Sequence, residues 1–254
     1  MFDSVGLSDL GLRRHNNEDR LLVREDLALY VVADGMGGHA AGEVAAELAT
    51  DEMARVIETT GALDGGTRPA EWDPHRSVNA NRLVTAILCA HRRVTRASEA
   101  DAGLRGMGAT ITAALLDGAR GQLAIAHVGD SRAYLLHENS LRLMTRDHSW
   151  VGEQVAAGIL SEEAARNHPL KNVVTRALGG AHEPVADADD HVLATGDLLL
   201  LCSDGLNTMV PDGDISAILR RGRGLKELAH ELVAEANRRG GVDNVTVILV
   251  RAMA

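Results

Sequence analysis

The nine residues from Leu27 to Gly35 read LALYVVADG, and this stretch indicates the fold most clearly. A nearly uninterrupted apolar run that stops at an aspartate is typical of a buried strand whose last residue reaches the edge of its sheet. The runs QLAIAHVGD, ending at Asp130, and DLLLLCSD, ending at Asp204, have the same form. The chain is therefore predicted to place three aspartates at the ends of buried strands.

Short apolar or alternating runs recur along the rest of the chain, each bounded by turn residues, and predict further strands. Most of them follow one another without an intervening helix, which favours an antiparallel α+β fold over a parallel sheet. Longer segments with apolar residues at helical spacing predict helices. The predicted strands are 5–8, 20–24, 27–33, 109–116, 122–128, 132–137, 141–144, 191–194, 198–203 and 242–250, and the predicted helices are 42–59, 77–99, 212–220 and 225–238.

Residues 1–254 are predicted to form a single domain, since this length fits one mixed fold and the chain has neither internal repeats nor an obvious linker. The segment 61–74 is rich in glycine and proline and predicts a surface loop. The segment 150–172 interrupts the strands with short helical pieces. We expect it to form an insertion, or flap, over a sheet edge.

The chain is acidic, with 26 Lys and Arg against 36 Asp and Glu and a formal net charge of −10. This balance disfavours nucleic-acid and anionic-membrane partners. No apolar run approaches the ~20 residues of a membrane span, and the first residues lack the basic and apolar regions of a signal peptide. Cys89 and Cys202 lie in apolar runs and are interpreted as reduced thiols. We therefore expect a cytoplasmic protein.

A fourth aspartate, Asp243, precedes its strand instead of ending it. The start of one antiparallel strand lies beside the end of its neighbour, so Asp34, Asp130, Asp204 and Asp243 can gather at one edge. Gathered carboxylates have raised pKa values unless a cation neutralises them, and an oxygen-only set suits Mg²⁺ or Mn²⁺. The carbonyl of Gly35 can complete such a set. Taken singly, an aspartate followed by glycine more often marks a turn.

Two such cations, roughly 3.5–4 Å apart, would share a carboxylate and a water that becomes hydroxide near neutral pH, ready for in-line attack on a phosphate. The segment 14–19, RHNNED, fits this chemistry. The planar fork of Arg14 can hold two phosphate oxygens. Glu18 and Asp19 can hold metal-bound waters in place. Alone, a charged loop of this kind is usually only solvated.

Five motifs occur in order along the chain, and together they closely resemble those of the bacterial metal-dependent (type-2C, PPM) Ser/Thr protein phosphatases. The resemblance extends from about Ser4 to Val250. It implies a four-layer α-β-β-α sandwich, with two packed, mainly antiparallel sheets flanked by helices and a flap at 150–172. The motifs are Arg14-x-x-Asn17-Glu18-Asp19, Asp34-Gly35-Met36-Gly37-Gly38-His39, Val128-Gly129-Asp130-Ser131-Arg132, Ser203-Asp204-Gly205 and Asp243-Asn244-Val245-Thr246.

The resemblance implies a role for each candidate metal ligand. Asp34 bridges two core cations, and Gly35 gives its carbonyl to one of them. Asp204 and Asp243 bind the other cation. Asp130 and Asp204 form a weaker third site. The implied cofactors are two Mn²⁺ or Mg²⁺ ions and a weaker third ion.

The resemblance also implies that Arg14 holds the substrate phosphate and that the flap at 150–172 influences substrate choice and binding of the third ion. His39 matches a position assigned as general acid for the leaving alkoxide. The alternative for His39 is a surface histidine in a glycine-rich loop.

These roles imply metal-dependent hydrolysis of phosphoserine and phosphothreonine on proteins. The implied partners are phosphorylated proteins, a Ser/Thr kinase and its substrates, with no nucleic acid and no membrane, and the implied state is a monomer. Two alternatives remain open. A phosphatase dedicated to one regulator would share the chemistry, whereas a catalytically silent module would bind a phosphoprotein and leave its phosphate in place.

Overall fold

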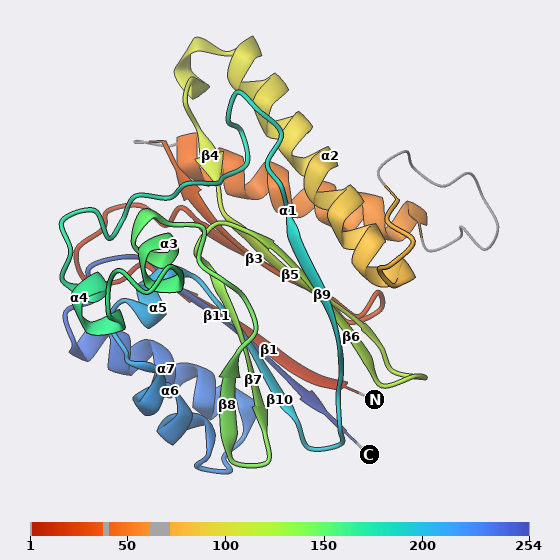
Figure 1. Cartoon of the computed structure of the whole chain (residues 1–254), viewed down its shortest axis with the longest axis vertical. Coiled ribbons are helices and arrows are strands. Elements are labelled where there is room, and N and C mark those ends of the chain that lie inside the picture. The colour runs from red at the N-terminus through yellow and green to blue at the C-terminus, as the bar shows by residue number, and fades with distance from the viewer. Residues whose placement is uncertain (1, 38–40, 61–71, 254) are drawn as a thin grey trace.

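Two antiparallel sheets lie face to face between two layers of helices (Figure 1). The structure, a computed structural model, describes residues 2–37, 41–60 and 72–253. The first sheet has the order β1 (Phe2–Asp9), β11 (Val245–Ala252), β10 (Leu198–Cys202), β7 (Arg132–His137) and β8 (Ser140–Leu143). The second has the order β2 (Asp19–Arg24), β3 (Leu29–Met36), β5 (Ile111–Asp117), β6 (Gln122–Val128) and β9 (Asp187–Val192), with β4 (Gly108–Ala109) paired to β3.

Helices cover the outer face of each sheet. The long helices α1 (Ala41–Thr60) and α2 (Val78–Ala100) pack on the second sheet, and α6 (Asp212–Leu219) and α7 (Leu225–Arg238) pack on the first. Ser77 begins α2 as an N-cap, with its side chain accepting a hydrogen bond from the third helical residue. The predicted four-layer α-β-β-α sandwich is confirmed.

Strand β3 is buried on both faces, which explains its unbroken apolar sequence. Tyr30 and Val32 pack against the first sheet in the space between the sheets, next to side chains such as Leu201. Leu29 and Val31 point the other way, into the layer beneath α1 and α2. Successive side chains of a strand alternate between its faces. A strand that is covered by a sheet on one side and by helices on the other therefore needs apolar residues throughout.

Some boundaries differ from the sequence predictions. The predicted strand 191–194 overlaps only the end of β9, because β9 is a polar strand at a sheet edge. The predicted strand 109–116 is split at Thr110, whose backbone N–H donates to the carbonyl of Asp34 at 2.8 Å. The short helix α5 (Asp204–Asn207) was not predicted. The loop 61–71 lies outside the described residues.

The predicted flap consists of two short helices, α3 (Trp150–Ala156) and α4 (Glu162–Arg166). Its two ends are held together, since the backbone N–H of Trp150 donates to the carbonyl of Val173 at 2.8 Å. The ring of Trp150 also stacks on His168, with the ring centroids 4.7 Å apart. Among the described residues, no helix has both the length and the apolar character needed to cross a membrane.

Candidate active site

Four aspartates come together at one edge of the sandwich, which we call the carboxylate edge. Asp34 lies near the end of β3, and Asp204 is the first residue of α5, directly after β10. Asp243 lies in the loop before β11, and Asp130 lies in the turn between β6 and β7. The carboxylate of Asp34 interacts electrostatically with those of the other three. The antiparallel arrangement thus brings together strand ends and a strand start, as the sequence predicts.

Burial and crowding raise the pKa values of three of these carboxyl groups, those of Asp34, Asp130 and Asp204. Burial is the largest cause for Asp34, whose pKa lies well above its usual value, and the charge of Asp204 adds to it. Burial raises the pKa of Asp130 in the same way, again with Asp204 as a like-charged neighbour. The pKa of Asp204 rises to about 6 through burial and the charge of Asp243, against a hydrogen bond with Asp34. This edge therefore favours bound protons or cations over four bare charges.

The donor set fits hard divalent cations. Carboxylate and carbonyl oxygens are the ligands that Mg²⁺ and Mn²⁺ prefer in proteins. Such cations displace the protons held by the crowded carboxyl groups and remove the mutual repulsion that raises their pKa values.

Two glycines allow the loops that carry these aspartates to approach closely. A Cβ atom on Gly205 would lie 1.9 Å from the carbonyl oxygen of Asn244. A Cβ atom on Gly35 would lie 2.0 Å from the carbonyl oxygen of Gly42, at the start of α1. Any larger residue at either position would separate the two backbones. The glycines that follow Asp34 and Asp204 are therefore required by packing, and no hairpin turn is formed at these positions.

Asp19 lies behind the carboxylate edge and is paired with Asp34 across β2 and β3. It is buried, and the Ser203 hydroxyl donates to its Oδ2 at 2.7 Å. The backbone N–H of Thr246 donates to the Ser203 oxygen at 3.0 Å, which turns the hydroxyl proton towards Asp19. Burial raises the pKa of Asp19 to about 7, against the hydrogen bonds from Ser203 and Thr246.

Arg14 stands at the open side of the edge, with its side chain 46% exposed. Its Nη2 donates to Oδ2 of Asp243 at 2.7 Å, and this hydrogen bond is the main cause of its raised pKa. Its Nη1 lies 3.9 Å from Oε2 of Glu18. The backbone N–H of Glu18 donates to the side chain of Asn244 at 2.9 Å, and burial raises the pKa of the Glu18 carboxyl. His39 lies outside the described residues.

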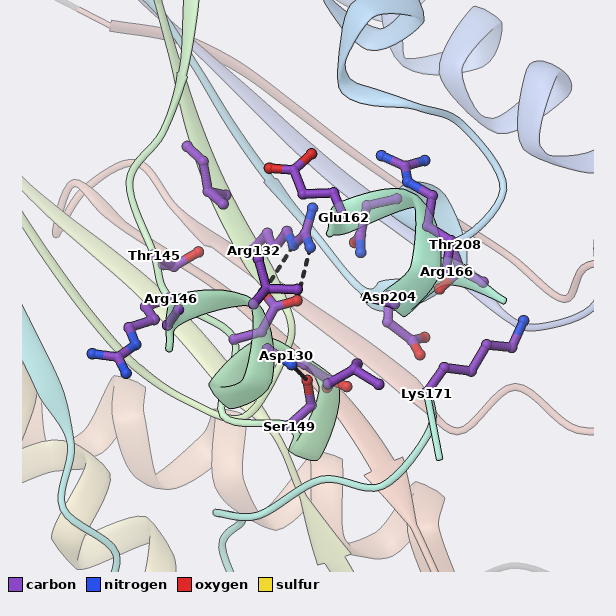
Figure 2. Close-up of a pocket in the computed structure, with 18 of the residues that line it drawn as sticks. Asp130, Arg132, Thr145, Arg146, Ser149, Glu162, Arg166, Lys171, Asp204 and Thr208 are labelled. Atoms are coloured by element: carbon purple, nitrogen blue, oxygen red, sulfur yellow. Dashed lines mark hydrogen bonds and ion pairs between the residues drawn. The ribbon is translucent and has the colours of Figure 1, made fainter. Parts of the chain in front are cut away.

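A cavity of about 260 Å³ separates the flap from the carboxylate edge (Figure 2). Asp130 and Asp204 line it together with two cationic residues of the flap region, Arg166 and Lys171. A substrate bound at the edge would therefore have flap side chains around it.

A largely buried ion pair lies in the wall of this cavity. Nε and Nη2 of Arg132 each donate to Asp147 at 2.8 Å. The dashed lines that leave Arg132 in Figure 2 mark these two hydrogen bonds. The third nitrogen, Nη1, donates to the Tyr134 hydroxyl at 2.8 Å, and that hydroxyl donates to Asp212 at 3.1 Å. The network joins β7, which begins just after Asp130, to the start of the flap and to α6.

A second cluster lies next to the turn that carries Asp130. It consists of His127, His148 and Asp187, whose ligand atoms lie within 4.8 Å of one another. Such a group could hold a metal ion, but the guanidinium of Arg176 already fills the position. Its Nη1 lies 3.2 Å from Nε2 of His148 and donates to Asp187 at 3.0 Å. A cation at this point would meet a fixed positive charge. We interpret the cluster as a hydrogen-bonded support.

Sequence reasoning missed the structural roles of Asp147, His148, Arg132 and Arg176. Arg132 and Asp147 lie 15 residues apart, and His148 and Arg176 lie 28 residues apart, so no local spacing reveals these contacts. The one available signal was the polar triplet 147–149 directly before the flap.

The chain resembles known proteins over nearly its whole length. Residues 13–239 match the family model of Protein phosphatase 2C. Serine/threonine phosphatase stp of Listeria welshimeri serovar 6b is 41% identical to this chain in sequence over 246 residues. The aligned residues cover 96% of this chain and 93% of the relative.

Two solved structures show the same fold. The serine/threonine phosphatase PstP/Ppp of Mycobacterium tuberculosis is 35% identical, with a TM-score of 0.86 over 100% of this chain and 99% of that chain. The catalytic domain of serine threonine protein phosphatase PstP in complex with 2 manganese ions is also 35% identical, with a TM-score of 0.82 and the same coverage.

Proposed function

Because this chain belongs to the protein phosphatase 2C family and hydrolyses phosphoserine and phosphothreonine on proteins, we propose that the carboxylate edge is its catalytic centre. The observation that supports this most is the convergence of four aspartates, three of which, Asp34, Asp130 and Asp204, have pKa values raised by burial and like charge. Perturbed carboxyl groups of this kind gather at catalytic and metal sites. The solved relative with 2 manganese ions supports divalent cations as the resident cofactor.

In this proposal two Mn²⁺ or Mg²⁺ ions are held at the edge. Asp34 would bridge them, the carbonyl of Gly35 would serve one, and Asp204 and Asp243 would serve the other. Asp130 and Asp204 would hold a weaker third ion. When bound, the ions neutralise phosphate charge and supply a water-derived nucleophile at neutral pH.

The residues around the ions have positioning and binding roles in this proposal. Arg14 is half-exposed, and its fork can donate two hydrogen bonds to phosphate oxygens while it stays beside Asp243. Glu18 and Asp19 accept hydrogen bonds from waters at the edge and hold them in place. Ser203 orients Asp19 by donating to it. We propose His39 as the general acid for the leaving alkoxide.

The wider setting is also part of the proposal. Residues 1–254 act as one catalytic domain and as a monomer in the cytoplasm, and the chain opposes a Ser/Thr kinase, which must supply its phosphorylated substrates. The buried thiol of Cys202, with its pKa raised by burial, is consistent with a reducing compartment.

A comparison of substrates tests this proposal. A general phosphatase is expected to release phosphate from short phosphothreonine peptides and from folded phosphoproteins alike. Release from a single folded phosphoprotein, with none from peptides, would point instead to an enzyme dedicated to one regulator. Binding without release by protein supplied with Mn²⁺ would overturn the assignment of the edge as a catalytic centre.

A further inference from the structure

His148 holds the backbone next to Asp130 through two reciprocal hydrogen bonds. It is buried, with 3% of its surface exposed, and it lies just before the flap. Its backbone N–H donates to the carbonyl of Gly129 at 2.9 Å. In return, the backbone N–H of Gly129 donates to Nδ1 of its ring at 3.2 Å. Both polar groups of the residue that precedes Asp130 are thus bound to one histidine.

The turn at Gly129 has little freedom on its other side. Gly129 has a φ of +111°, and a Cβ atom there would lie 2.4 Å from the side chain of Thr110. The backbone N–H of Thr110 donates to the carbonyl of Asp34. The hydroxyl of Thr110 forms a hydrogen bond with the hydroxyl of Ser131 at 2.7 Å. The position of Asp130 therefore depends on Thr110 on one side and on His148 on the other.

The far side of the imidazole is also held. Since Nδ1 accepts a hydrogen bond from the backbone N–H of Gly129, the neutral ring carries its proton on Nε2. Nε2 lies 3.3 Å from Oδ2 of Asp187 and 3.2 Å from Nη1 of Arg176. The ring of His127 stacks on it, with the centroids 4.6 Å apart. Asp187 is held in place by Arg176 at 3.0 Å. The ring orientation is thereby set, and Nδ1 is directed at Gly129.

The same histidine joins the two ends of the flap. Its carbonyl accepts a hydrogen bond from the backbone of Thr175 at 2.8 Å, next to Arg176. Thus the segment that enters the flap, the segment that leaves it and the turn that carries Asp130 all meet at His148.

We propose that His148 is a positioning residue: it sets Asp130 for the third divalent cation and is the contact through which the flap acts on this cation. The inference rests on the proposed function of the edge, because it takes Asp130 and Asp204 as the ligands of that ion. The ion binds best when His148 holds the turn of Gly129 and Asp130 in place. By thermodynamic linkage, binding of the ion must then stabilise the contacts of His148 with this turn and with the flap.

Two conservative substitutions separate this role from a merely structural one. In His148→Asn the side-chain oxygen takes the place of Nδ1 and still accepts the hydrogen bond from the backbone N–H of Gly129. In His148→Gln the amide takes the place of Nε2 and the acceptor at Nδ1 is lost. The matched control is His91→Gln. His91 is also buried and accepts a backbone N–H from Gly179 through Nδ1 at 3.2 Å, but Gly179 is not adjacent to a candidate ligand.

Mn²⁺ binding to the full chain, measured by titration calorimetry, gives the direct readout. The wild type is expected to bind two ions tightly and a third weakly. His148→Gln is expected to lose about tenfold or more in affinity for the third ion, within the range for residues that support metal ligands. The affinities of His148→Asn and His91→Gln for the third ion are expected to stay within about threefold of the wild-type affinity.

Trypsin cleavage in the flap, at Arg166 and Lys171, provides a second readout. Mn²⁺ is expected to slow cleavage of the wild type and of His148→Asn, and to have little effect on His148→Gln. Equal third-ion affinity and equal protection in the Asn and Gln variants would overturn the inference. A wild type that binds only two ions would overturn it as well, while Mn²⁺-dependent phosphate release would show that the proposed function stands.

Discussion

Nη2 of Arg14 donates to Oδ2 of Asp243 across 2.7 Å, so the candidate phosphate-binding cation is paired directly with a candidate metal ligand. Arg14 is 46% exposed and Asp243 is 30% exposed, so the pair faces the solvent from which a phosphate would arrive. A guanidinium held in this place can bind a phosphate without first being brought to the site.

We expect Arg14→Ala to lower kcat/KM for a phosphothreonine peptide by about 10- to 100-fold. This corresponds to the ~1.5–3 kcal/mol of a hydrogen bond to a charged group. Arg14→Lys keeps the charge but loses the fork, so it should recover only part of the activity. Exposed Arg142 provides the control, since Arg142→Ala should leave kcat/KM unchanged. An Arg14→Ala variant with wild-type kcat/KM would exclude this role.

The effect of Mn²⁺ on stability should depend on pH. The pKa values of Asp204 and Asp19 are raised to about 6 and about 7, so the native state keeps protons that the unfolded chain releases near pH 4. This edge therefore contributes less stability to the metal-free protein as pH rises from about 4 to about 7. Mn²⁺ competes with the same protons, so its affinity should rise over that interval.

The measurement is Tm with and without Mn²⁺, at about pH 5.5 and about pH 7.5. The increase in Tm caused by Mn²⁺ is expected to be larger at the higher pH. Buried histidines such as His127, whose pKa is lowered by burial, affect both samples equally and cancel in the difference. An increase that is larger at the lower pH would contradict the account of the carboxylate edge.

The ion pair between Arg132 and Asp147 should contribute to stability more than surface pairs do. Its side chains are only 19% and 14% exposed, and two hydrogen bonds of 2.8 Å join them. Asp147→Ala leaves the guanidinium without its main partner, and we expect the free energy of unfolding to fall by about 3 kcal/mol. Urea unfolding measures this loss. The exposed pair of Arg238 and Glu235 gives the comparison, since Arg238→Ala should cost less than about 1 kcal/mol.

The sequence alone predicts the layered fold because the signals for it are local. The run 29–33 is apolar throughout, since one side of β3 meets the other sheet and the other side meets the helices. The polar edge strand β9 carries no such signal, so the sequence predicts only its last residues as a strand. Helix α5 begins immediately after β10, and four residues are too few for a helical pattern.

The candidate site could be predicted in part for the same reason. Asp34, Asp130 and Asp204 follow apolar runs, so their place at strand ends is visible in the sequence. The contacts of His148 with Gly129 and Asp187 depend on how the segment before the flap packs on the second sheet. No periodicity encodes such a contact, and it becomes visible only in the folded chain.

The most direct test of the central claim is the release of inorganic phosphate from a phosphothreonine peptide by the wild type and by Asp204→Asn, each with Mn²⁺ and after chelation. We expect release by the wild type that requires Mn²⁺ and stops on chelation. We expect almost none from Asp204→Asn, because the substitution removes a negative ligand shared by two of the proposed ion positions. Near-wild-type release by Asp204→Asn, or release by the wild type that persists without a divalent cation, would contradict the assignment of the carboxylate edge as the catalytic metal centre.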